Sequence, residues 1–214
     1  MAKFPEPPGV EALRAIPPVL HHLPEGTTMA RLCFVGGEFS TSWDTFRCYG
    51  PTTSRFDHQL PDGQGRAQVQ DRGIMYLATG PEAIPTCLAE VFQATRLIAR
   101  HARDPVLSGF NLAADLTLLD LTGPFATAIG ASMAIHSGPR PRARRWAQQL
   151  YEAYPDIDGL LYCSSMYGNA PAIALFERGA WAIPKRPVFH RELRDAVMAN
   201  ILTETGRVIG YEVV

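Results

Sequence analysis

The chain has 214 residues, 46% of them hydrophobic, which is enough apolar content for one large domain that folds on its own. Its 20 Lys and Arg residues nearly balance its 21 Asp and Glu residues, for a formal net charge of −1. This balance argues against nucleic acid or an anionic membrane surface as the main partner, because both attract basic proteins.

Residues 1–28 are predicted to be a proline-rich N-terminal extension that packs on the domain. They contain one short helical stretch, Val10 to Ala15. They show no basic segment leading into an apolar stretch, and no run in the chain approaches the roughly 18 apolar residues of a membrane span. We therefore expect a cytoplasmic protein that makes no membrane contact.

Residues 29–214 are predicted to form a single mixed α/β domain. Its first strand, Met29 to Phe34, is apolar except for Arg31. A polar stretch that includes Arg55 leads to a strand from Gly73 to Thr79. Because this second strand is apolar on both faces, we expect it at the centre of a sheet.

A helix is predicted to start at Gly80-Pro81, with Thr79 as its N-cap. Helical spacing gives it an apolar face that consists of Ile84, Leu88, Val91, Phe92 and Ile98. The later elements alternate: a strand from Ala114 to Thr122, a helix from Arg142 to Tyr154, buried strands within 158–165 and 172–177, a helix from Arg191 to Glu204 and a strand from Arg207 to Val214.

Several well-known site motifs are absent from the sequence. There is no GxGxxG after a strand, no Walker lysine loop and no HExxH. The four cysteines are widely spaced, without a CxxC pair or a histidine at metal-ligand spacing, so we expect reduced, mostly buried thiols and no metal. We expect the six histidines at the surface, and we interpret the arginines between 140 and 145 as a solvated helix start.

Five polar residues are embedded in the predicted elements or next to them: Arg31, Arg55, Tyr76, Glu90 and Ser164. A buried guanidinium needs an anionic partner. Arg31 therefore either meets an internal carboxylate or a ligand phosphate, or its head reaches solvent past the sheet edge. Arg55 has a nearby partner of the right charge in Asp57.

The other three candidates each allow a structural and a functional interpretation. Tyr76 shares its strand face with apolar residues, as a core tyrosine would. Glu90 lies away from the apolar helix face, as a solvent-facing glutamate would. Ser164 ends a buried alternating face, where its hydroxyl either caps the next turn or touches a ligand. No single position decides between these interpretations.

The order of these segments resembles the RES domain family, which is named for its Arg, Glu and Ser. The similarity covers roughly residues 29 to 190. It rests on the arginine strand, on Ser54-Arg55-Phe56-Asp57, on the strand Gly73 to Ala78 with the helix segment Leu88 to Phe92, and on Asp158 to Ser164 before Ala174-Leu175-Phe176. The chain departs from many relatives, which have Gly-Arg-Trp in place of Ser54-Arg55-Phe56, and its proline-rich extension lengthens it.

The resemblance implies both a fold and an activity. The implied fold is α+β, an ADP-ribosyltransferase-like RES fold with a central split β-sheet flanked by helices. The implied activity is hydrolysis or phosphorolysis of the nicotinamide–ribose bond, with NAD as substrate, inorganic phosphate as co-substrate in phosphorolysis, and no cofactor. Members of the family are commonly toxins paired with an Xre-type antitoxin, and the resemblance also suggests a homodimer.

The residues carried over from the family suit this chemistry. Arg31 and Arg55 would bind the NAD diphosphate, because guanidinium groups hold phosphates in bidentate fashion. Tyr76 would line or stack on the nicotinamide ring. Glu90 would stabilise an oxocarbenium-like ribose. Ser164 would orient the nicotinamide ribose or a phosphate, and Arg31 and Ser164 count with Glu90 as catalytic.

The sequence leaves two further hypotheses. One is a transferase that moves ADP-ribose onto a macromolecule, which differs from the first function only in the acceptor. The other is a module that binds a nucleotide without turning it over. A binder would be stabilised by NAD without releasing nicotinamide.

Overall fold

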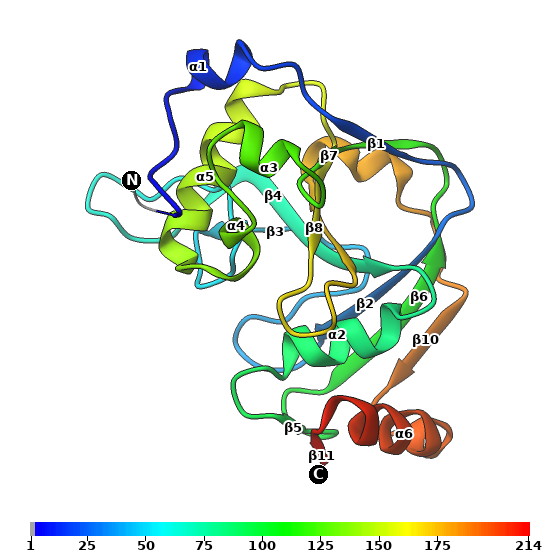
Figure 1. The fold of residues 1–214 in the computed structure, drawn as a ribbon. Coiled ribbons are helices and arrows are strands. Elements are labelled where there is room, and N and C mark those ends of the chain that lie inside the picture. The colour runs from blue at the N-terminus through cyan, green and yellow to red at the C-terminus, as the bar shows by residue number, and fades with distance from the viewer. Residues whose placement is uncertain (1–2) are drawn as a thin grey trace.

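The computed structural model describes residues 3–214, which form a nine-stranded mixed sheet, a two-stranded sheet and flanking helices (Figure 1). The large sheet has the order β1-β7-β8-β9-β4-β2-β6-β10, with β3 paired to β4. Its strands are β1 (Leu20–Leu23), β2 (Thr28–Phe34), β3 (Arg47–Gly50), β4 (Gln68–Thr79), β6 (Pro105–Asn111), β7 (Leu116–Asp120), β8 (Gly159–Cys163), β9 (Pro171–Phe176) and β10 (Phe189–Glu192).

The small sheet pairs β5 (Leu97–Ile98) with β11 (Glu212–Val213) in parallel. Two short 3₁₀ helices, η1 and η2, cover Glu177–Ala182 and Ala196–Met198. The α-helices are α1 (Val10–Arg14), α2 (Ala83–Val91), α3 (Phe125–Ala128), α4 (Ala134–Ser137), α5 (Arg140–Ala153) and α6 (Ala199–Ile209). None of the helices within residues 3–214 combines the length and the apolar character that crossing a membrane requires.

The large sheet is split between β2 and β4. β4 pairs with β9 over five residues, Ile74 to Ala78, but with β2 only at Met29 and Ala30. Beyond Ala30, β2 continues along β6 as far as Phe34 and leaves β4. The α+β fold with a central split β-sheet flanked by helices is therefore confirmed, and the split opens one wall of a cavity.

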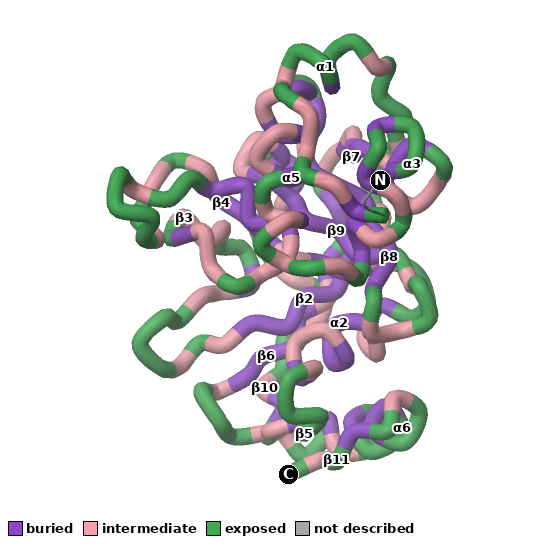
Figure 2. The backbone as a smooth tube through the Cα atoms, turned by 60° about the vertical axis from the view of Figure 1, so that its left-hand side comes forward, coloured by how far each residue is buried: buried purple, intermediate pink, exposed green. Residues whose placement is uncertain are grey.

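From Gly73 to Ala78 both faces of β4 are buried, as the apolar sequence of this part predicts. Met75 and Leu77 pack into one core cluster with strands β8 and β9. On the other face, Ile74 packs against the cluster around α5, and Ala78 joins the cluster of α2 and α6. The two helix layers thus lie on the same side of β4, and burial is concentrated in β2, β6, β8, β9 and the second half of β4 (Figure 2).

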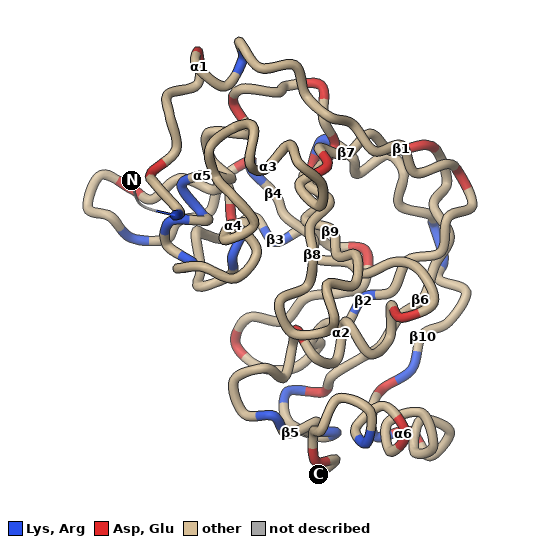
Figure 3. The backbone as a smooth tube through the Cα atoms, in the orientation of Figure 1, with Lys and Arg blue, Asp and Glu red and all other residues tan. Residues whose placement is uncertain are grey.

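The N-terminal segment follows the surface of the domain. Phe4 is buried and stacks on Trp146 of α5, with the ring centroids 6.5 Å apart. Glu6 pairs with Arg142 and Arg145 at the start of the same helix. β1 then adds an edge strand beside β7. Charges of both signs are interspersed through most of the chain (Figure 3).

The helix predicted to begin at Gly80-Pro81 is shorter than expected. α2 covers Ala83–Val91, and Ile98 belongs to β5 rather than to the helix. Thr79 does not cap it, because its hydroxyl donates to the Thr28 carbonyl at 3.0 Å. Arg96 adopts a left-handed φ of 55° that turns the chain towards β5.

The C-terminal prediction also needs correction. The predicted helix from Arg191 to Glu204 is wrong at its start, because Arg191 lies in β10 and pairs with β6. α6 begins at Ala199 and ends at Ile209, where Gly210 has the left-handed conformation that commonly ends helices. The predicted strand from Arg207 is reduced to two residues. β1, β3 and β6 were not predicted at all.

Candidate functional site

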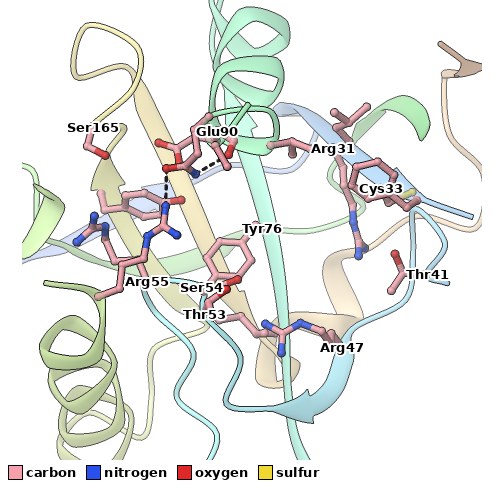
Figure 4. Close-up of a pocket in the computed structure, with 18 of the residues that line it drawn as sticks. Arg31, Cys33, Thr41, Arg47, Thr53, Ser54, Arg55, Tyr76, Glu90 and Ser165 are labelled. Carbon is pink, nitrogen blue, oxygen red and sulfur yellow. Dashed lines mark hydrogen bonds between the residues drawn. The ribbon is translucent and has the colours of Figure 1, made fainter. Parts of the chain in front are cut away.

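A cavity of about 500 Å³ lies where β2 and β4 separate (Figure 4). β2, β4 and β8 form its floor, and the end of α2, the start of α5 and residues 53–55 form its sides. Its polar lining includes Arg31, Arg47, Arg55, Arg103, Arg140, Tyr76, Glu90 and Ser165. Four of the five residues predicted from the sequence therefore meet in one cavity, and the fifth, Ser164, lies directly behind it.

Glu90 is held at the cavity wall by Ser164. The Ser164 hydroxyl donates to Glu90 Oε1 at 2.6 Å and accepts from the backbone N–H groups of Met166 and Tyr167, at 3.2 and 3.1 Å. Ser164 thus caps the turn after β8 and orients the carboxylate of a different element. Its neighbour Ser165 is the serine that lines the cavity.

Arg31 is buried, with an exposed fraction of 6%, so its head does not reach solvent past the sheet edge. Its Nη1 donates to the backbone carbonyl of Trp43 at 2.9 Å. Within residues 3–214 no carboxylate forms an ion pair with it. Burial lowers the pKa of Arg31 to about 10, which leaves the group charged at neutral pH. The cavity therefore contains a buried cation that no carboxylate of residues 3–214 contacts directly.

Arg55 faces the cavity from the opposite side, but Asp57 is not its partner. Its Nη1 donates to the carbonyl of Gly138 at 2.6 Å. Burial lowers the pKa of Arg55, and the positive charge of Arg140 lowers it further. Two like charges held near each other in a partly buried place favour an anion between them.

Asp57 instead joins β3, β4 and residue 52 behind the cavity wall that β3 and residues 51–57 form. It is fully buried, and its Oδ1 accepts from Arg47 Nη2 at 2.6 Å and from the Tyr76 hydroxyl at 2.9 Å. Its Oδ2 accepts from the N–H and the hydroxyl of Thr52, at 2.6 and 2.7 Å. The Tyr76 hydroxyl accepts from the N–H of Phe56 at 3.1 Å. The four bonds that Asp57 accepts occupy the roughly four lone-pair sites of its carboxylate.

Tyr76 presents its ring to the cavity while its hydroxyl is bound to Asp57. Burial, together with the negative charge of Asp57, raises the pKa of Tyr76 well above its ordinary value. The phenol therefore stays neutral, and its contribution to the cavity is an aromatic surface.

Three cavity arginines were not predicted as site residues: Arg47, Arg103 and Arg140. Arg140 was interpreted as part of a solvated helix start, but it donates to Gln93 across the cavity. Arg47 lies on a strand too short to be recognised, and Arg103 lies in a loop. Only the excess of arginine near polar loops could have indicated them.

The predicted surface position is wrong for two histidines. His58 and His136 are buried, with exposed fractions of 0% and 4%, and burial lowers the pKa of each. His58 stacks on Tyr151 and packs against the tilted ring of Phe176, and its Nε2 is 3.2 Å from Glu177 Oε2. Neither histidine lines the cavity.

The cysteines and the acidic and histidine side chains form no cluster of metal ligands within residues 3–214. All four cysteines are free thiols, and three of them are buried, as predicted.

The charge of the cavity points to an anionic ligand. Five guanidinium groups and one carboxylate, Glu90, belong to its lining. Guanidinium groups in a concave, partly desolvated site attract phosphate and carboxylate groups strongly. The single carboxylate lies next to them, where it can stabilise a positive charge that develops on a bound ligand.

Comparison with known proteins bears on the fold of the chain. No family model and no curated protein matches the chain. Among solved structures, the fold is similar to that of a chain in the crystal structure of the M. tuberculosis MbcT–MbcA toxin–antitoxin complex. The TM-score is 0.53 at 16% identity, over 91% of this chain and 96% of that one. The split-sheet α+β fold is therefore shared with a known structure along nearly the whole length of both chains.

Proposed function

We propose that this protein cleaves the nicotinamide–ribose bond of NAD, by hydrolysis or by phosphorolysis. The observation that carries the proposal is the Glu90 carboxylate, fixed by Ser164 in a cavity whose other charged side chains are arginines. NAD combines the two features that such a site fits, an anionic diphosphate and a ribose that becomes cationic as nicotinamide leaves.

In the proposed reaction, the bond between the ribose anomeric carbon and the nicotinamide nitrogen breaks. Nicotinamide leaves as a neutral molecule with the bonding electron pair, and the ribose takes on oxocarbenium character. Glu90 stabilises this positive charge, which develops only as the bond breaks. Water or inorganic phosphate then forms the new bond to carbon and releases a proton to solvent.

The other residues bind and orient the substrate. Arg31 and Arg55, on opposite sides of the cavity, hold the diphosphate, and the cationic lining offers a place for inorganic phosphate as co-substrate. The Tyr76 ring packs against nicotinamide, since its hydroxyl is committed to Asp57. No resident cofactor enters this scheme, because the substrate carries its own leaving group.

Ser164 acts through Glu90 in this proposal. A serine hydroxyl has one proton and two lone pairs, and all three are used by Glu90, Met166 and Tyr167. Direct contact with ribose or phosphate, as first suggested by the resemblance, would require one of these bonds to break. We therefore treat Ser164 as a positioning residue.

The fold comparison supports a biological role for this activity. The similar chain comes from a toxin–antitoxin complex. We extend the proposal to an intracellular toxin that depletes NAD and is held inactive by an antitoxin. The Xre type of that antitoxin and the homodimer, which the RES resemblance suggests, belong to the same proposal.

The test is nicotinamide release from NAD by the purified protein, with and without inorganic phosphate. Release supports the proposal, and dependence on phosphate separates phosphorolysis from hydrolysis. NAD labelled in the adenosine part identifies a transferase, because only a transferase leaves label on a macromolecule. Thermal stabilisation by NAD with no release of nicotinamide would instead show a nucleotide-binding module.

A further inference from the structure

Arg103 lies at the rim of the cavity in a strained turn. The turn joins β5 to β6, and both Arg103 and Asp104 have left-handed φ angles, 63° and 47°. Neither residue is glycine, so each conformation carries an energetic cost that the surrounding structure must offset. The turn pairs with the chain that follows β2, through bonds from Val35 N to Asp104 O at 3.1 Å and from Gly36 N to Arg103 O at 3.0 Å.

The chain opposite this turn is shaped to receive it. A Cβ atom on Gly36 would lie 2.5 Å from Asp104 Oδ2 and 3.2 Å from the backbone carbonyl of Arg103. A Cβ atom on Gly37 would lie 3.4 Å from the Arg103 side chain. Asp104 is also held by Arg194, at 3.1 Å. The two glycines and this ion pair fix the position of Arg103 although it belongs to a loop.

The guanidinium of Arg103 rests on the ring of Phe34, with Cζ 3.9 Å from the ring centroid. Phe92 supports that ring edge-on, with the centroids 6.3 Å apart. Arg103 is exposed and lines the cavity, and no partner within residues 3–214 forms a hydrogen bond or an ion pair with its guanidinium. A flat cation is thus supported on an aromatic ring and has no polar partner from the described chain.

The place of Arg103 along the cavity indicates what it contacts. Glu90, Arg55 and Ser165 lie towards one side, and Arg31, Cys33 and Thr41 towards the other (Figure 4). Phe34 directly follows Cys33, and its carbonyl accepts from the N–H of Thr41 at 2.8 Å. Arg103, on the ring of Phe34, therefore lies at the end of β2, one residue beyond Cys33.

We infer that the guanidinium plane of Arg103 is the platform on which the adenine base of the dinucleotide stacks. This inference rests on the proposed function. With nicotinamide riboside at Glu90 and the diphosphate at the buried arginines, the adenosine extends towards Phe34 and Arg103. A planar guanidinium supported on one face offers its other face to a purine. This stacking needs a flat cation, which arginine provides and lysine does not.

The test compares NAD with nicotinamide mononucleotide, which has the same scissile bond but no adenosine. Arg103→Ala is expected to lower kcat/KM for NAD about tenfold, mainly through KM, and to leave the mononucleotide within twofold. Arg103→Lys is expected to behave like Arg103→Ala, because lysine keeps the charge but lacks the plane. Arg207→Ala, an exposed arginine on α6, controls for the loss of one charge.

Two results would overturn the inference. Equal losses for NAD and the mononucleotide would place Arg103 at the reacting end, and full activity of Arg103→Lys would show a charge contact with a phosphate. If the wild-type protein releases no nicotinamide, the proposed function fails first. Calorimetry with ADP-ribose and with ribose 5-phosphate then tests Arg103 alone, since Arg103→Ala must weaken only ADP-ribose.

Discussion

Two walls of the same cavity use a carboxylate in different ways. On the wall made by α2 and the turn after β8, Glu90 lines the cavity and accepts one short bond from a side-chain hydroxyl, that of Ser164. On the wall made by β3 and residues 51–57, Asp57 is fully buried and accepts four bonds. A carboxylate with free lone pairs at a cavity can act on a ligand, whereas a saturated one fixes its neighbours.

The largest expected effect concerns the Asp57 wall. Asp57→Asn should lower the free energy of unfolding by about 3 kcal/mol, because Arg47 loses its buried partner and the new amide N–H₂ faces the N–H of Thr52. Urea unfolding measures this change. Asp71→Asn, an exposed position on the same strand as Tyr76, serves as the control. A loss no larger than that of the control would contradict the role assigned to Asp57.

Arg31 tests whether the cavity cation serves a ligand. Arg31→Met removes a buried charge and one bond to a backbone carbonyl, two changes that oppose each other in stability. We expect the free energy of unfolding to change by less than about 1 kcal/mol, and the affinity for NAD to fall about tenfold or more. Melting curves with and without NAD measure both. An unchanged NAD-dependent rise in Tm would exclude Arg31 from binding.

Ser164 and Ser165 separate positioning from contact on the Glu90 wall. Ser164→Ala should lower kcat about tenfold with KM within twofold, because Glu90 loses its orienting bond. Ser165→Ala, which alters only the lining, should change KM more than kcat. Steady-state kinetics on NAD give both values. A Ser164→Ala variant with raised KM and normal kcat would show that Ser164 contacts the substrate directly.

The smallest expected effect is a pH dependence near the Asp57 wall. Burial lowers the pKa of His58, so on acidification the unfolded chain takes up a proton before the folded protein does. The free energy of unfolding should be constant above about pH 7 and fall below about pH 6.5, by about 1 kcal/mol at pH 5.5. His58→Gln should reduce this loss. His136 acts in the same direction, so part of the slope persists in the variant.

If the free energy of unfolding of His58→Gln falls between pH 7 and pH 5.5 as much as that of the wild type, protonation of His58 does not contribute to the loss of stability. Urea titrations at the two pH values, for the wild type and for His58→Gln, give this slope directly.

Much of the fold follows from local pattern. The strand around Tyr76 is apolar on both faces, and it lies at the centre of the sheet with partners on both sides. The fully buried strand before Ser164 and the strand that follows it were also predicted. Short or polar strands such as β1 and β3 were missed, because four residues with mixed polarity carry no clear period.

The sequence predicted most of the candidate site residues, but not which side chains bond to one another. Four predicted side chains line the cavity, yet the pairing of Asp57 with Arg47 instead of Arg55 depends on the register between β3 and β4. Glu90 was placed correctly away from the apolar helix face, but only the tertiary fold shows that this direction faces a cavity. Arg103 depends on a turn whose left-handed residues give no sequence signal.

The most direct test of the role assigned to Glu90 is nicotinamide release from NAD by wild type, Glu90→Gln and Glu82→Gln. Glu82 is the N-cap residue of α2, the helix that carries Glu90. Its carboxylate also bonds to the turn after β8, because it accepts from the Tyr167 hydroxyl, but it does not line the cavity. We predict a fall on the order of 10² or more for Glu90→Gln, with an unchanged melting temperature, and near-normal release for Glu82→Gln. Equal release by folded wild type and Glu90→Gln would contradict the assignment of Glu90 as the catalytic carboxylate.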